Sequence, residues 1–122
     1  MTVKVDVSED GVTVSLDGVD AVWALRRRLV LTADDLLDAR VLPRAEARRH
    51  RGWRLGGTAV PGVVCAGNYT VPRRRGDRAF WSVYRDDEVL EIETTRAKPR
   101  FVVLQHPERR ELAERIRGLV AR

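Results

Sequence analysis

The chain has 122 residues, of which 43% are hydrophobic and 34% charged. This balance excludes a disordered chain, and the length suits one hydrophobic core, so a single domain over residues 1–122 is expected. No apolar run approaches the roughly 20 residues of a membrane-spanning helix. No apolar segment follows the first basic residue, as it would in a secretory signal, so a cytoplasmic protein is expected.

The numbers of cysteine and arginine residues further limit the classes of protein to which the chain can belong. Cys65 is the only cysteine, which excludes an intrachain disulfide and suits a reducing compartment. We interpret it as a small buried hydrophobe. The formal net charge is +5, and 21 of the 23 basic residues are arginine, since only Lys4 and Lys98 are lysines. A coding sequence rich in G and C explains this composition, and so does recognition of phosphate or carboxylate by the planar guanidinium.

Alternating side chains predict short strands along most of the chain. Val3, Val5 and Val7 alternate with polar residues ahead of the Asp10-Gly11 pair, and a second alternating run follows. Asp-Gly suits the positive φ angles of a type I′ turn, so these two runs predict a hairpin. The eight expected strands cover residues 3–7, 12–16, 28–31, 39–42, 63–70, 79–84, 89–94 and 101–105.

Helical structure is expected at three places. Residues 20–25 and 33–37 each predict a short helical segment, the second because Thr32 and Asp35 resemble a capping box. A longer helix is expected from Pro107 onward, since proline suits the first helical position. One apolar stripe runs along it, formed by Leu112, Ala113, Ile116, Leu119 and Val120.

Two stretches in the middle of the chain are not expected to form regular elements. Residues 44–51 have no apolar stripe, so we expect them to be exposed. Residues 52–62 contain four glycines and a proline and are not expected to be regular throughout. The fold class predicted from all of these patterns is mainly β, in consecutive antiparallel hairpins, with a C-terminal α-helix. Such a sheet curls into two layers or a barrel to remove its edges, and the helix plugs its open end.

The sequence resembles the pleckstrin-homology-like (PH-like) fold, and most closely the small bacterial PH-like domains of actinobacterial proteins. The resemblance lies in the strand order with its terminal helix and in three segments. These segments are Trp23-Ala24-Leu25-Arg26-Arg27-Arg28, the glycine-rich GWRLGGTAVPG at residues 52–62, and Phe80-Trp81. It implies a curled antiparallel sheet or barrel of about seven to eight strands, capped by the terminal helix.

Some members of this superfamily bind phosphoinositides through basic residues around their first hairpin loop. Here that loop is Ser8-Glu9-Asp10-Gly11, which is acidic and would repel an anionic headgroup. No lipid-binding residue is therefore carried over from the resemblance.

No catalytic residues, metal site or cofactor are predicted. The two histidines, His50 and His106, have no second ligand at metal spacing, and we interpret His106 as a cap or surface residue. Gly56-Gly57-Thr58 lacks the spacing and lysine of a phosphate-binding loop. The acidic clusters at residues 34–35 and 86–88 are explained by turn chemistry. We therefore expect a protein that is not an enzyme.

Clusters of basic residues are the remaining feature of the sequence that indicates a function. Four occur, at residues 26–28, 48–51, 73–75 and 109–110, and two of them flank the glycine-rich stretch. If these two converge near Trp53 and Tyr69, they form an anion-attracting face. Otherwise they are separately solvated loops. Likewise, Trp53 either packs inward or docks a partner. The candidate partner-binding or anion-binding residues are Arg48, Arg49, Arg51, Trp53, Arg73, Arg74 and Arg75.

These observations favour a non-enzymatic interaction or scaffold module that binds a protein partner or a second copy of itself. The alternative is attachment to an anionic membrane surface, or to another anion, through the arginine loops. Nucleic acid is disfavoured because only seven aromatic residues are present and most are expected in the core. No small-molecule ligand is predicted.

Overall fold

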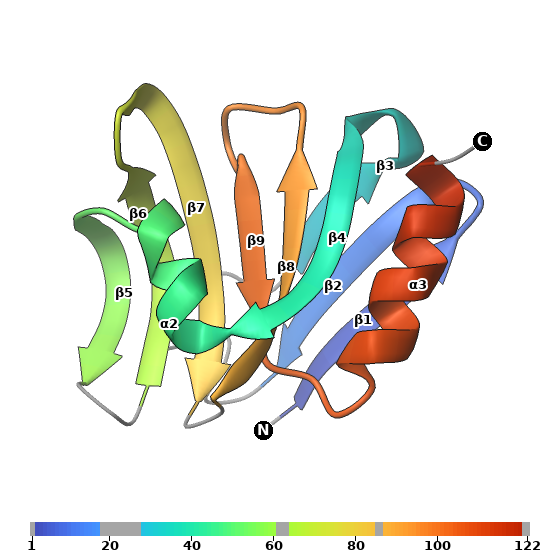
Figure 1. The fold of residues 1–122 in the computed structure, drawn as a ribbon, viewed down its shortest axis with the longest axis horizontal. Helices are drawn as coiled ribbons and strands as arrows, with labels where there is room; N and C mark the ends of the chain where they lie inside the picture. Colours follow the sequence, from blue (N-terminus) through green and yellow to red (C-terminus); the bar gives the residue numbers. More distant parts are fainter. Residues whose placement is uncertain (1, 18–27, 61–63, 85–86, 121–122) are drawn as a thin grey trace.

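A computed structural model describes residues 2–17, 28–60, 64–84 and 87–120, which form nine strands in two sheets and a C-terminal helix (Figure 1). The predicted helix at 20–25 and most of the Trp23–Arg28 segment lie outside the described residues. The smaller sheet comprises β1 (Thr2–Ser8), β2 (Gly11–Asp17) and β3 (Arg28–Thr32). The larger sheet comprises β4 (Leu36–Pro43), β5 (Arg54–Val60), β6 (Val64–Val71), β7 (Arg74–Tyr84), β8 (Glu88–Thr94) and β9 (Phe101–Leu104).

The smaller sheet confirms the predicted N-terminal hairpin. β1 and β2 pair antiparallel from Thr2↔Asp17 to Ser8↔Gly11, and β3 adds to β2. Gly11 has φ +144°, and a Cβ atom there would collide with the Leu31 carbonyl oxygen. Glycine therefore lets β3 approach the turn of the hairpin closely.

The larger sheet corrects the expectation of an antiparallel sheet built mostly of consecutive hairpins. Its order is β4-β8-β9-β7-β6-β5, and β9 runs parallel to β7. All four residues of β9, Phe-Val-Val-Leu, are buried, so this strand needs cover on both faces and a neighbour on each side. β8 supplies one antiparallel neighbour, and β7 supplies the other in the parallel sense.

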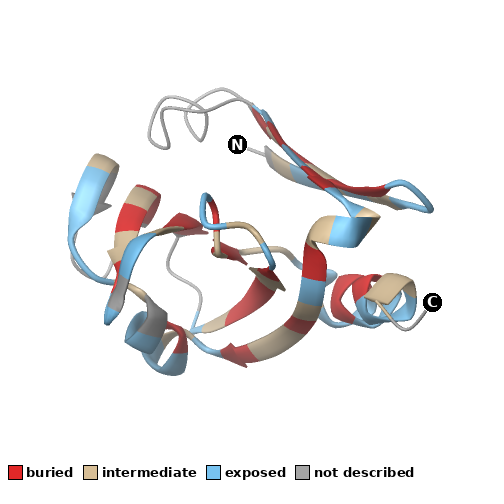
Figure 2. Cartoon of the chain, turned by 90° about the horizontal axis from the view of Figure 1, so that it is seen from above, coloured by how far each residue is buried: buried red, intermediate tan, exposed pale blue. Residues whose placement is uncertain are grey.

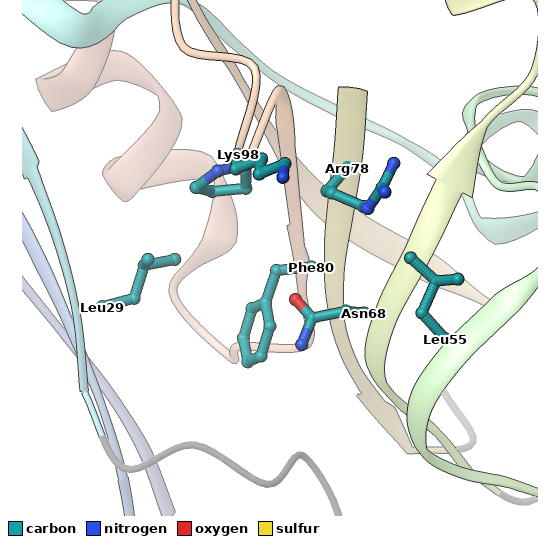
Figure 3. A pocket seen from close by; sticks show the side chains of 7 residues that line it. Leu29, Leu55, Asn68, Arg78, Phe80 and Lys98 are labelled. Atoms are coloured by element: carbon teal, nitrogen blue, oxygen red, sulfur yellow. The ribbon is translucent and has the colours of Figure 1, made fainter. Parts of the chain in front are cut away.

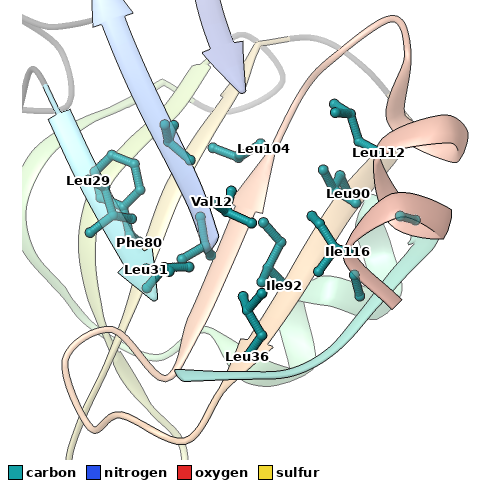
Figure 4. Packing of buried hydrophobic residues seen from close by; sticks show 14 of the residues in the cluster. Val12, Leu29, Leu31, Leu36, Phe80, Leu90, Ile92, Leu104, Leu112 and Ile116 are labelled. Atoms are coloured by element: carbon teal, nitrogen blue, oxygen red, sulfur yellow. The ribbon is translucent and has the colours of Figure 1, made fainter. Parts of the chain in front are cut away.

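The described strands do not close into a barrel. They form two open sheets with a hydrophobic core between them, and α3 (Arg109–Val120) packs along one side (Figure 2). The predicted stripe of α3 is confirmed, because Leu112, Ala113 and Ile116 are buried against both sheets and Leu119 and Val120 pack at its margin (Figure 4). The helix covers the core beside β4 rather than plugging the end of a closed barrel.

A strand in the glycine-rich stretch is the main element that the sequence analysis missed. β5 pairs antiparallel with β6, and Gly57 lies opposite Gly67 with both residues at positive φ (109° and 126°). A Cβ atom on either glycine would collide with a backbone oxygen of the facing strand. The glycines therefore permit two backbones to approach more closely than residues with side chains would allow.

The second face of the larger sheet is also covered, which the sequence analysis did not predict. A second cluster there contains Tyr69, Trp81 and Ala47, the last from α2 (Arg44–Ala47), which leads into η2 (Arg48–His50). Residues 44–51 were expected to be wholly exposed, but Ala47 is fully buried. The short element η1 (Ala33–Asp35) replaces the predicted turn at 33–37, because β4 already begins at Leu36.

Candidate functional site

The two arginine clusters that flank the glycine-rich stretch lie toward the same end of the larger sheet. One is in η2, and the other surrounds Arg73 in the turn between β6 and β7. Thr70 joins them: its carbonyl accepts a hydrogen bond from the Gly52 N–H (2.6 Å), and its hydroxyl accepts one from the Trp53 N–H (2.7 Å). In Figure 1 the chain from α2 to β5 accordingly runs near the upper end of β6.

Five exposed arginines belong to the chain segments on either side of this junction, and we call them the arginine end: Arg48, Arg49, Arg54, Arg73 and Arg75. No described carboxylate forms an ion pair with any of them. Residues 44–84 contain nine arginines but only Glu46 and Asp77 as acidic residues, a local net charge of +7 against +5 for the whole chain. Arg44 pairs with Asp87 (3.9 Å), whereas the arginine end has no described ion pair, so its positive charge attracts anions.

Trp53 lies among these arginines at the start of β5. Its ring is exposed, with 83% of the residue accessible to solvent. The backbone is nevertheless fixed, because Trp53 N–H donates to Thr70 Oγ1 and its carbonyl accepts a hydrogen bond from the Thr70 N–H (2.8 Å). Of the two alternatives for Trp53, inward packing is therefore wrong. A rigidly held, exposed tryptophan is the kind of residue that anchors a partner.

β5 also forms an edge of the larger sheet. It pairs with β6 alone among the described strands, so one row of its backbone N–H and C=O groups faces away from the sheet. Unpaired edges of this kind accept a further strand. The exposed tryptophan, the unpaired edge and the arginine end thus lie next to one another.

Arg51 differs from the other candidate residues because its side chain turns inward. Its guanidinium lies over the rings of Trp81 (4.8 Å to the centroid) and Tyr69 (5.3 Å), and its Nη1 donates to Cys65 Sγ (2.8 Å). These contacts anchor the chain just before Trp53. We therefore assign Arg51 to the scaffold beneath the arginine end and not to its exposed surface.

Tyr69 belongs to the same inner cluster as Arg51, and the pKa of its phenol is raised. Burial raises the pKa of Tyr69 well above its ordinary value, and the hydrogen bond and charge of Cys65 raise it further, whereas the charges of Arg51 and Arg54 act in the opposite direction. Cys65 Sγ donates to the Tyr69 hydroxyl (3.0 Å), and Cys65 is buried as predicted. The phenol is therefore neutral at physiological pH, and the cluster supplies packing rather than an acid or base.

The structure does not place every predicted basic residue at this surface. Arg74 begins β7, and its side chain lies outside the described residues, as does that of His50. Arg109 and Arg110 belong to the other half of the sheet, where they pair with Glu88 at 3.7 and 2.9 Å. Among the candidates, the structure thus brings together Arg48, Arg49, Trp53, Arg73 and Arg75.

The sequence analysis missed Arg54 and a second group of charges. Arg54 is not part of an arginine cluster in the sequence, and only its position next to Trp53 indicates a role. The second group lies across β4 and β8, where Glu91 is fully buried 3.5 Å from Arg40. Glu93 pairs with Arg40 (2.5 Å) and with Arg100 (3.8 Å). These charges neutralise one another, so we interpret them as structural.

Within the described part of the chain, no group of three or more His, Cys, Asp or Glu side chains can hold a metal ion. None of the helices there is long and apolar enough to cross a membrane. His106 acts as the predicted cap, since its Nδ1 accepts a hydrogen bond from the Glu108 N–H (3.0 Å). Comparison of the chain with protein-family profiles, with curated protein sequences and with solved structures finds no match.

Proposed function

We propose that this chain is a non-enzymatic interaction module that binds an acidic, extended segment of another protein. The segment lies along the free edge of β5 and contacts Trp53 and the arginine end. The observation that carries this proposal is the exposed Trp53 set among five arginines that no described carboxylate neutralises. Backbone hydrogen bonds to the edge supply affinity, and the acidic side chains supply charge complementarity.

The unpaired edge favours a protein partner over a membrane. Lipids cannot satisfy a row of backbone N–H and C=O groups, whereas an added strand satisfies all of them. The charges also argue against a second copy of the chain as the partner. Two copies meeting through this surface would bring like charges together, and that costs free energy. An anionic membrane and self-association are therefore the competing outcomes of the test.

The PH-like resemblance remains part of the proposal. A terminal helix packed against two sheets supports it, but the described strands form two open sheets. The proposed function does not depend on this resemblance, since it rests on the surface beside β5.

The test is a titration of the whole chain with a synthetic peptide of alternating Glu and Val residues, followed by backbone amide NMR. We expect saturable binding that weakens with added salt, with the largest shifts in β5 and at Trp53. A Lys and Val peptide of the same length should not bind. An N-methylated Glu and Val peptide should bind at least about tenfold more weakly, because it lacks the donors for strand pairing.

Two variants locate the site. Trp53→Ala should weaken binding by at least about tenfold, the scale expected of an aromatic anchor. Trp53→Phe should retain most of it. Binding of the Glu and Val peptide that does not change in Trp53→Ala would overturn the proposal. Binding of phosphatidylserine vesicles without binding of the peptide would replace it with the membrane function, and dimerisation through β5 would replace it with self-association.

A further inference from the structure

A cavity of about 310 Å³ lies between the two sheets, on the side of the core away from α3. It is lined by residues of β3, β5, β6 and β7 and of the turn before β9: Leu29, Leu55, Asn68, Arg78, Phe80, Lys98 and Pro99. Figure 3 shows Arg78 and Lys98 together on one side of the cavity, with Phe80 and Asn68 facing them and Leu29 and Leu55 on its flanks. This volume is at the lower end of the range for small-molecule sites.

The lining has one apolar part and one cationic part. Leu29 is 3% exposed and Phe80 is 1% exposed, so the apolar part is built from core residues. The cationic part consists of Arg78 and Lys98. No carboxylate lines the cavity, and no described carboxylate forms an ion pair with either cation.

The backbone fixes the two cations relative to each other. The Arg78 N–H donates to the Ala97 carbonyl (2.7 Å), and the Arg100 N–H donates to the Arg78 carbonyl (2.6 Å). Ala97 precedes Lys98 in the chain and Arg100 follows it. Their hydrogen bonds to Arg78 therefore hold the backbone of Lys98 next to Arg78. The guanidinium of Arg78 donates a hydrogen bond from Nη1 to the Asp77 carbonyl oxygen (2.9 Å). Most of its five N–H donors are therefore left for another acceptor.

From this arrangement we propose that the cavity binds a small amphipathic carboxylate, with its apolar chain against Phe80 and Leu29 and its carboxylate between Arg78 and Lys98. A guanidinium and an ammonium side by side suit a carboxylate head. Phe80 and Leu29 supply an apolar part of the lining, so a ligand with an apolar chain fits the cavity better than a purely polar anion. The cavity volume equals that of roughly ten water molecules, at about 30 Å³ for each in the liquid. We therefore choose as ligand an eight-carbon monocarboxylate, whose non-hydrogen atoms number about the same.

The experiment is calorimetric titration of the whole chain with octanoate, with octan-1-ol and octylamine as matched ligands that have no negative charge. We expect saturable 1:1 binding of octanoate, and binding of the alcohol that is at least about tenfold weaker. Octylamine should not bind, because Arg78 and Lys98 would repel it. Equal binding of all three ligands, or no saturable binding of octanoate, would overturn the proposal.

Variants place the ligand in this cavity. Arg78→Gln and Lys98→Gln should each weaken octanoate binding by about tenfold. Arg110→Gln, on α3 and outside both the cavity lining and the arginine end, should leave it unchanged. Leu55→Glu introduces a negative charge at a residue that is 53% exposed, so the fold should be retained while binding is lost. Unchanged affinity in Arg78→Gln and Leu55→Glu would exclude the site. Leu55 also belongs to β5, which borders the proposed peptide site, whereas Arg78→Gln and Lys98→Gln change neither β5 nor the arginine end. The effect of these two variants on octanoate binding is therefore independent of the proposed peptide site.

Discussion

The two halves of the larger sheet contain arginines in opposite electrostatic settings. In the half formed by β4, β8 and β9 with α3, arginines lie within 4 Å of carboxylates from the same elements. The pairs there include Arg40–Glu91, Arg100–Glu93, Arg109–Glu88, Arg110–Glu88 and Arg117–Asp38. In the half formed by β5, β6 and β7, the arginine end has no described ion pair. An arginine-rich composition therefore does not itself indicate a surface with unpaired positive charge, whereas the local lack of carboxylates does.

The largest expected effect comes from breaking a pair in the neutralised half. Arg40→Met removes the cation beside the fully buried Glu91, and we expect the free energy of unfolding to fall by about 3 kcal/mol, as for other disrupted buried pairs. Urea unfolding of the variant and of the unaltered chain measures this loss of free energy. The double variant Arg40→Met, Glu91→Met should recover most of the loss. If the double variant is as unstable as the single one, the charge of Glu91 is not the cause.

A smaller effect is expected beneath the arginine end, at Arg51. Arg51→Met keeps the aliphatic stem but loses the contacts of the guanidinium with Trp81, Tyr69 and Cys65. We expect a loss of about 1–2 kcal/mol, the value for a partly desolvated cation–π contact with one hydrogen bond. The neighbouring exposed Arg49→Met, measured by the same urea unfolding, should change stability by less than about 0.5 kcal/mol. Equal losses in both variants would contradict the inward assignment of Arg51.

The pH dependence of stability tests the same cluster through Tyr69. Its pKa is raised in the folded chain above the ordinary value of 10.0, so above pH 10 the unfolded state releases the phenolic proton while the folded state retains it. Stability should therefore be fully present below pH 10 and fall above it, by up to about 1.4 kcal/mol for each pH unit. Tyr69→Phe cannot titrate and should show a shallower decline between pH 9 and 11. Parallel pH profiles of the two proteins would show that Tyr69 is not responsible.

Much of the fold could be predicted from the sequence because it is local. The N-terminal hairpin follows from alternation and an Asp-Gly turn, and the stripe of α3 follows from its helical period. The position of β9 between β8 and β7 could not be predicted, since a short apolar run specifies burial but not its neighbours. β5 was missed because Gly57 and Gly67 stabilise a strand only through each other, and this pairing is long-range.

The candidate site was predictable in its residue types but not in its geometry. The clusters around Arg48 and Arg73 are evident in the sequence, whereas their position toward the same end of the sheet depends on hydrogen bonds at Thr70. Nothing in the sequence distinguishes Arg51, which turns inward, from its exposed neighbour Arg49. The separation arises because Arg51 lies next to Tyr69 and Trp81, two rings from different strands of the folded sheet.

The most direct test of the contrast between the two halves compares two variants of equal charge. One replaces four paired arginines with glutamine: Arg96, Arg109, Arg110 and Arg117. The other replaces four residues of the arginine end with glutamine: Arg48, Arg49, Arg73 and Arg75. Affinity for the Glu and Val peptide is measured for both at the same ionic strength. We predict that the first variant retains the affinity of the unaltered chain, and that the second loses at least about tenfold. Equal losses in the two variants would mean that net charge alone attracts the peptide, and this would contradict a binding surface at the arginine end.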